Sequence, residues 1–108
     1  MQSFKSDNSI FGQRLRMARL AANIPQDKLG VKAGLDESTA SARISRYESG
    51  VHEPNLAFAQ RLAFELGVPT AYFFAEDDDL ARLILWFSRL NGAKRQQLLK
   101  TAAEIGEE

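Results

Sequence analysis

Three observations predict an all-α fold for this chain of 108 residues. Apolar residues recur at helical spacing along almost every segment, as Phe11, Leu15, Ala18 and Ala22 do, and strand-like alternation of useful length is missing. Residues that start or stop helices divide this pattern into short segments. The length suits one compact domain, and the hydrophobic fraction of 44% is ordinary for a folded protein.

The first part of the chain predicts four helices, over residues 10–22, 26–33, 36–48 and 55–66. Pro25 favours the start of the second, and Gly34 ends it. Asp36 or Ser38 is the expected N-cap of the third helix, which Gly50 ends, and Asn55 can cap the fourth. Packing of the second helix on the third requires small or apolar crossing positions, here Leu29, Gly30, Ala33 and Ile44.

The second part predicts a helical turn at residues 72–74 and two further helices, over residues 79–90 and 93–105. Asp77 to Asp79 precede the first of these, where acidic side chains complement the helix dipole. Asn91-Gly92 separates the two helices. We therefore expect a C-terminal helical hairpin over residues 76–108, packed on the first four helices.

Composition excludes several classes of protein. The chain has no cysteine, and no apolar run is long enough to cross a membrane, so we expect a cytoplasmic protein without membrane contact. Residues 1–9 are polar, lack the apolar core of a signal peptide and are expected to form a flexible arm. The net charge is zero, but residues 1–63 carry nine basic and six acidic side chains, whereas residues 64–108 carry five and eight. The excess of +3 in the first part is a weak indication of a surface that faces a polyanion.

Nothing in the sequence predicts an enzyme, a cofactor or a metal site. His52 is the only histidine, so neither a metal site nor a histidine-assisted nucleophile is expected. The acidic run 76–79 lacks the spacing of a calcium loop, and the glycines do not form a phosphate-binding loop.

Several spaced elements between residues 11 and 68 occur in a fixed order. A helix ends near Arg19, a short helix opens with Gln26, and a third closes with Ile44-Ser45-Arg46-Tyr47-Glu48-Ser49-Gly50. Pro54 and a helix ending Leu66-Gly67-Val68 follow. This order resembles the Xre/Cro type of helix-turn-helix, the lambda-repressor-like DNA-binding domains.

The resemblance implies a lambda-repressor-like helical bundle over residues 10–75, with the C-terminal hairpin mediating dimerisation. It implies a sequence-specific transcriptional regulator, expected to be a repressor, that binds double-stranded DNA as a homodimer at a near-palindromic operator. It also implies that Arg19 and Glu48 form an internal ion pair with a structural role.

The resemblance also assigns DNA contacts by position. Gln26 matches a residue that touches phosphate, and Arg14 and Arg16 are further phosphate candidates. Candidate base-reading side chains lie on or near the third helix: Thr39, Ser41, Ala42, Arg43 and Arg46. Arg46 is the strongest of these, because a guanidinium can bind guanine through two hydrogen bonds.

One departure from the family pattern lies between Gly34 and Ile44, which are ten residues apart where the usual pattern has nearer six. The additional segment lengthens either the turn or the start of the third helix. In the second case the base contacts would shift by a residue or two, and Asp36 and Glu37 would approach phosphates.

Apolar side chains of the hairpin have two interpretations. Leu83, Trp86, Phe87 and Leu90 are core residues, a dimer interface, or both, because they offer more apolar surface than one face of a lone helix needs. An alternative function is an antitoxin or another protein-interaction module that docks a partner protein through these helices. A domain that kept the fold and lost DNA binding is a third possibility.

Overall fold

The computed structural model describes residues 9–107, and the elements that it forms there are all helical. The predicted all-α class is therefore confirmed. The helices are α1 (Ile10–Ala21), α2 (Gln26–Lys32), α3 (Ala40–Ser49), α4 (Leu56–Leu66), the 3₁₀ helix η2 (Thr70–Phe74), α5 (Asp78–Arg89) and α6 (Gly92–Gly106). The expected arm over residues 1–9 lies outside the described residues except for Ser9, whose hydroxyl caps α1 at the amide of Gly12.

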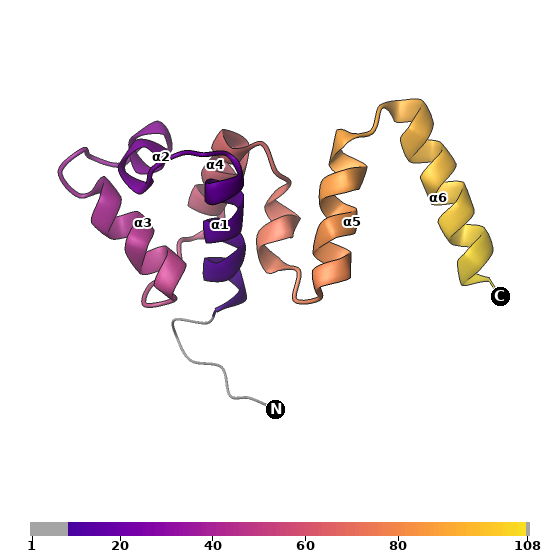
Figure 1. Cartoon of the computed structure of the whole chain (residues 1–108), viewed down its shortest axis with the longest axis horizontal. Helices are drawn as coiled ribbons and strands as arrows, with labels where there is room; N and C mark the ends of the chain where they lie inside the picture. Colours follow the sequence, from indigo (N-terminus) through magenta and orange to yellow (C-terminus); the bar gives the residue numbers. More distant parts are fainter. Residues whose placement is uncertain (1–8, 108) are drawn as a thin grey trace.

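Helices α1 to α4 and η2 surround one hydrophobic core, and we call this part the N-terminal bundle (Figure 1). Its largest fully buried side chains come from five different helices: Phe73, Leu15, Leu29, Ile44 and Leu62. Leu15 and Leu62 belong to the apolar stripes that the sequence shows at helical spacing. Each helix therefore contributes its apolar face to a shared interior, as the periodicity predicts.

Two glycines allow α3 to approach its neighbours closely. A Cβ added at Gly30 of α2 would lie 2.7 Å from the Cβ of Ala40, and one added at Gly12 of α1 would lie 2.3 Å from the carbonyl oxygen of Glu48. Both distances are shorter than real Cβ contacts. Close crossing at these two points fixes the position of α3 against α1 and α2.

The segment before α3 lengthens the turn and not the helix. Helix α3 begins at Ala40, so the prediction of a helix from residue 36, capped by Asp36 or Ser38, is wrong at that end. Locally, the amide and hydroxyl of Thr39 donate to the carbonyl oxygen of Asp36, at 3.0 and 3.3 Å, and the Ser38 hydroxyl donates to the Asp36 carboxylate. Such side-chain and turn bonds compete with helix formation.

Asparagine and aspartate side chains begin three of the other helices. Asn55, Asp77 and Asn91 each accept a hydrogen bond from the backbone amide three residues later, at 2.8, 2.9 and 2.9 Å. These residues are the N-caps of α4, α5 and α6. The caps place the helix starts within one or two residues of the sequence-based expectation.

Helices α5 and α6 follow each other through residues 90–91, and we keep the name hairpin for them. Only α5 packs on the N-terminal bundle. Ala81 of α5 is buried, and Ile84 and Leu85 pack against the core. Gly92–Gly106 includes no buried residue, and α6 lies at the opposite end of the molecule from α3 (Figure 1). The expectation that the whole hairpin packs on the bundle is therefore wrong for α6, because α5 stands between α6 and the core.

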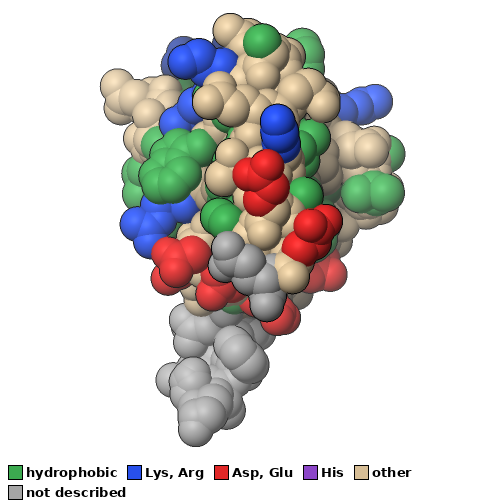
Figure 2. Space-filling model, turned by 90° about the vertical axis from the view of Figure 1, so that its right-hand side faces the viewer, with side chains coloured by type: hydrophobic (Ala, Val, Ile, Leu, Met, Phe, Trp, Pro, Cys, Tyr) green, Lys and Arg blue, Asp and Glu red, His purple; other side chains and the backbone are tan. Residues whose placement is uncertain are grey.

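Charge is divided along the hairpin. Arg89, Lys94 and Arg95 lie near its tip, and Asp77 to Asp79 with Glu104 and Glu107 lie near its open end. Figure 2 shows the molecule from the α6 side, with acidic side chains gathered in the lower part, most basic ones higher up, and apolar side chains among them. None of the described helices is long and apolar enough to span a membrane.

Candidate nucleic-acid interface

One face of α3 is polar and exposed to solvent. Ser41, Ala42, Ser45 and Arg46 are exposed, whereas Ile44, Tyr47 and Glu48 on the other side of the helix are buried. Three of the exposed residues belong to the predicted base-reading set, and Ser45 was missed. Its position, four residues after Ser41 and three after Ala42, places it on their face, so helical spacing alone could have found it.

Arg43 and Thr39, also in the predicted set, lie at the margins of this face. The Arg43 guanidinium donates to the Tyr47 hydroxyl at 2.9 Å and lies 5.8 Å from the centre of the Tyr47 ring. Thr39 is the N-cap residue of α3, and its hydroxyl donates to the carbonyl oxygen of Asp36. Both side chains are exposed. In order to contact DNA, each of these side chains would have to break its intramolecular hydrogen bond or share it with the DNA.

A buried carboxylate connects the exposed face to the core. Glu48 is 7% exposed and accepts a hydrogen bond from the Gln26 amide at 3.1 Å. The oxygen of the same Gln26 amide accepts from the Ser41 hydroxyl at 3.4 Å. Gln26 begins α2 and Ser41 lies in the first turn of α3, so this chain of bonds holds the two helix starts together.

The charge of Glu48 is balanced by arginines of α1. Arg19 is buried and donates from Nε and Nη2 to the two carboxylate oxygens, at 2.5 and 3.2 Å, and from Nη1 to the carbonyl oxygen of Ile24 at 3.1 Å. Arg16 lies 3.6 Å from the same carboxylate, with most of its side chain exposed. The ion pair expected between Arg19 and Glu48 is therefore present, and it joins α1 to the end of α3.

A family model described as helix-turn-helix matches residues 15–73, which is more than half of the chain. The chain belongs to the lambda-repressor-like, Xre/Cro-type helix-turn-helix family. The match covers α2, α3 and the residues that bond Glu48, so the candidate face of α3 lies within the part of the chain that the family shares.

A solved structure extends the similarity beyond the family model. The crystal structure of transcriptional regulator BswR is 40% identical to this chain and superimposes with a TM-score of 0.82. The match covers 86% of this chain and 92% of that one. No curated protein matches the sequence.

Within this helix-turn-helix protein, the two arginines expected on phosphate lie in different surroundings. Arg16 is exposed and lies beside Glu48, the carboxylate that also accepts a hydrogen bond from Gln26 at the start of α2. Arg14 is only 4% exposed and donates to the carbonyl oxygen of Ala75, so its assignment to phosphate is corrected. Arg14 lies three residues after Phe11 and four before Ala18, within the apolar stripe. That spacing was the available signal of burial.

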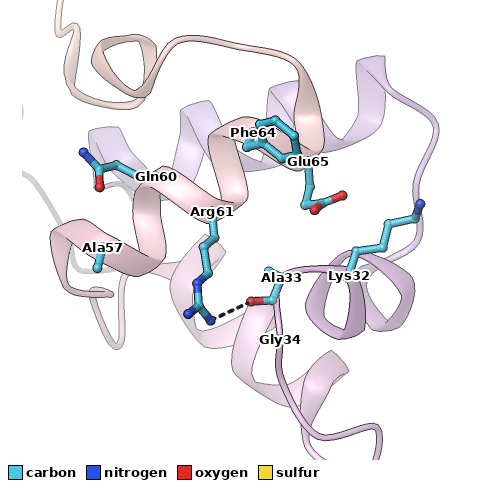
Figure 3. A pocket seen from close by; sticks show the side chains of 8 residues that line it. All are labelled: Lys32, Ala33, Gly34, Ala57, Gln60, Arg61, Phe64 and Glu65. Atoms are coloured by element: carbon cyan, nitrogen blue, oxygen red, sulfur yellow. Dashed lines mark hydrogen bonds between the residues drawn. The ribbon is translucent and has the colours of Figure 1, made fainter.

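A hollow on the surface lies away from the recognition helix. It is lined by Lys32, Ala33 and Gly34 at the end of α2 and by Ala57, Gln60, Arg61, Phe64 and Glu65 of α4 (Figure 3). Arg61 donates to the carbonyl oxygen of Ala33 at 3.4 Å across it. No residue of α3 lines this hollow, so it is separate from the candidate DNA-binding face. Residues 9–107 contain no cluster of three potential metal ligands.

Proposed function

We propose that this protein is a non-enzymatic, sequence-specific DNA-binding transcription regulator that binds a near-palindromic operator as a homodimer. The observation that carries the proposal is the exposed polar face of α3, held at fixed positions by Gly30, Gly12 and the Gln26–Glu48 bond. A helix of this kind fits the major groove, which is about 12 Å wide. The transcriptional regulator BswR, similar over most of the chain, supports the same function.

The side chains divide into base-reading and phosphate-binding groups. Arg46 lies on the exposed face and can bind the O6 and N7 atoms of guanine. Ser41 and Ser45 can donate to or accept from base edges, and Ala42 can contact a thymine methyl group. Gln26 lies beside Ser41 and Arg16 beside Glu48, and both side chains suit phosphate. Phosphate contacts fix the orientation, and base contacts select the sequence.

The C-terminal hairpin supports a dimer. Its large exposed apolar side chains are Leu80, Leu83, Trp86, Leu99 and Ile105. Two of the predicted interface residues, Leu83 and Trp86, are among them, and the other two, Phe87 and Leu90, are half-buried. Helix α6 buries no residue, so packing on the rest of the chain stabilises it little. Its 15 residues are near the length at which an isolated helix is marginal in water. A second copy that covers this surface would stabilise α6.

The division of charge on the hairpin favours the same occupant. A two-fold axis that pairs two hairpins in opposite directions brings Lys94, near the tip of each, to Glu104, near the open end of the other. The surface is therefore complementary to itself. As a repressor, such a dimer acts by occupying its operator in the cytoplasm.

The experiment that tests DNA binding is selection of genomic fragments by the purified protein at two salt concentrations. We expect one near-palindromic site to be enriched, and Arg46→Ala to weaken its binding by about 1–3 kcal/mol, or about 5- to 150-fold. The matched control is Arg82→Ala, an exposed arginine of α5 that pairs with Asp79 of its own helix. Recovery of no fragment above background at either salt concentration would contradict the proposal.

Sedimentation of the full chain tests the dimer. We expect twice the chain mass of 12.0 kDa, and the chain mass itself for a Leu83→Glu variant. Trp86, the only tryptophan, gives a second measurement, because quenching by acrylamide should rise in the variant. A wild-type monomer with an accessible Trp86 would favour the second function, a module that docks a partner protein on the hairpin. The observation that supports this second function is that Trp86 is 56% exposed.

A further inference from the structure

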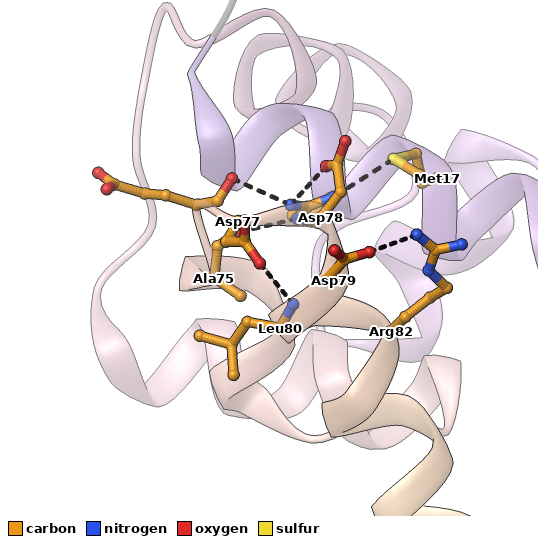
Figure 4. A network of polar contacts seen from close by, with 9 residues as sticks. Met17, Ala75, Asp77, Asp78, Asp79, Leu80 and Arg82 are labelled. Carbon is orange, nitrogen blue, oxygen red and sulfur yellow. Dashed lines mark hydrogen bonds and ion pairs between the residues drawn. The ribbon is translucent and has the colours of Figure 1, made fainter. Parts of the chain in front are cut away.

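Arg14 connects α1 to the segment that joins the N-terminal bundle to the hairpin. Its guanidinium donates from Nε to the carbonyl oxygen of Ala75 at 2.9 Å, and from Nη2 to the carbonyl oxygen of Glu76 at 3.4 Å. Nη2 also donates to the carboxylate of Asp78 at 3.0 Å. Figure 4 shows this region, where Asp77, Asp78 and Asp79 lie close together at the start of α5. All three acceptors belong to residues 75–78, the last of which is the first residue of α5.

Only an arginine can make this set of bonds from one buried position. The guanidinium is rigid and planar and carries its donors in a fixed fork, so its three acceptors are held in fixed directions relative to one another. The group also lies 5.8 Å from the centre of the Tyr72 ring in η2, which limits its position from another side. Arg14 therefore holds the direction in which the chain enters α5.

Apolar contacts supply the rest of the attachment of α5. Ala81 is buried, and Ile84 and Leu85 pack against the core. Apolar burial holds α5 near the bundle, but it is not directional, so it restricts the angle of the helix less than hydrogen bonds do. The hydrogen bonds of Arg14 are the directional part of this attachment.

We propose that Arg14 is a positioning residue that sets the angle between the N-terminal bundle and the C-terminal hairpin, and through that angle the spacing of the two half-sites that a dimer binds. This inference rests on the proposed function. In the proposed dimer, the hairpin binds the second copy and α3 contacts the DNA. The junction at Arg14 lies between these two elements, which together determine the distance between the two recognition helices.

Half-site spacing is sensitive to this angle because DNA is helical. Dimers of helix-turn-helix proteins bind half-sites about 10–10.5 base pairs apart, or multiples of that distance. One added base pair moves a half-site by about 3.4 Å and rotates it by about a tenth of a turn. With a rigid junction, affinity should therefore be much higher at one half-site spacing than at its neighbours. With a flexible junction, affinity should depend little on the spacing.

The test measures the affinity of the full chain for duplexes whose half-sites are separated by spacers that differ by single base pairs. For wild type we expect one preferred spacer. For Arg14→Lys, which keeps the charge and loses the fork, we expect the preference over the neighbouring spacers to fall by about fivefold or more, the lower range of coupling between linked sites. Affinity for a single half-site should not change, whereas a purely structural role for Arg14 would lower both affinities together.

The matched control is Arg61→Lys, an arginine that donates to a backbone carbonyl within the bundle and not across the junction. Its spacer preference should equal that of wild type. A folded Arg14→Lys protein with the wild-type spacer preference would overturn the proposal. If Arg14→Lys does not fold, Asp78→Ala replaces it, because that side chain is 86% exposed and its removal leaves the core intact. Because Asp78→Ala leaves the bonds to the carbonyl oxygens of Ala75 and Glu76, we expect it to lower the spacer preference less than Arg14→Lys would, and a preference equal to that of wild type would exclude Asp78 from the positioning.

A second measurement separates this proposal from the proposed function. The chain has no cysteine, so spin labels at Ala57→Cys in α4 and Arg82→Cys in α5 report the distance between bundle and hairpin without DNA. Labelled chains diluted with unlabelled ones give the distance within one chain. We expect Arg14→Lys to broaden this distribution and Arg61→Lys to leave it unchanged. Failure of wild type to select DNA refutes the proposed function, whereas an unchanged distribution in Arg14→Lys refutes the positioning role.

Discussion

The pair α2–α3 and the pair α5–α6 are both two consecutive helices, but they are held together in different ways. In the first pair, Gly30 allows contact with Ala40, and both helices bury apolar side chains such as Leu29 and Ile44. In the second, α6 buries none, and Arg95 donates to the carbonyl oxygens of Phe87 and Ser88 at 3.0 and 2.8 Å. The first pair buries its apolar side chains within one chain, whereas the second leaves Leu83 and Trp86 exposed.

The difference matches the proposed roles. A recognition helix must present its side chains in fixed positions, which close packing provides. A dimerisation element needs apolar surface that remains available for the second copy. In the proposed dimer, the apolar faces of the helices therefore form a closely packed interior in the N-terminal bundle and an interface on the hairpin.

The largest effect should come from removal of Arg19, which holds the first pair to α1. Arg19→Ala leaves the carboxylate of Glu48 buried without its main partner, so we expect the free energy of unfolding to fall by about 3–5 kcal/mol. Urea denaturation measures it. Arg16→Ala is the control, because its side chain is 60% exposed and should change stability little. A loss below about 1 kcal/mol for Arg19→Ala would show that the ion pair does not hold the helices together.

A pair of glycine substitutions sharpens the comparison directly. Gly30→Ala places a Cβ 2.7 Å from that of Ala40, and we expect it to destabilise the protein by about 1–3 kcal/mol. Gly92→Ala in α6 has no described atom within 4 Å of the new Cβ, so it should be neutral or stabilising by up to about 1 kcal/mol. Thermal unfolding of both variants provides the measurement. Equal effects would mean that the two helix pairs are packed alike.

The most local effect should follow loss of the bonds that join α6 to α5. Arg95→Ala removes two donors from carbonyl oxygens in the last turn of α5, at about 0.5–1.5 kcal/mol each. We expect faster amide hydrogen exchange in α6 and unchanged exchange in α2 and α3. Lys100→Ala, an exposed position on α6, serves as control. Faster exchange throughout the chain would show that the hairpin and the bundle unfold as one unit.

Local chemistry in the sequence determined much of this protein. Helical periodicity gave the all-α class, and Asn55 and Asn91 marked helix starts that the structure has. The order of elements between residues 11 and 68 identified the family, and the resemblance to that family predicted the Arg19–Glu48 ion pair. These features depend on residues close in sequence or on a pattern that the family shares.

Tertiary structure decided the remainder. Arg14 and Arg16 differ by two positions on one helix, and only the fold shows that the first meets carbonyl groups of residues 75 and 76 while the second stays in solvent. The start of α3 at Ala40 depended on competition between a helical turn and the bonds around Asp36, which are similar in energy. The separation of α6 from the core follows from the position of α5, because periodicity tells which face is apolar but not what covers it.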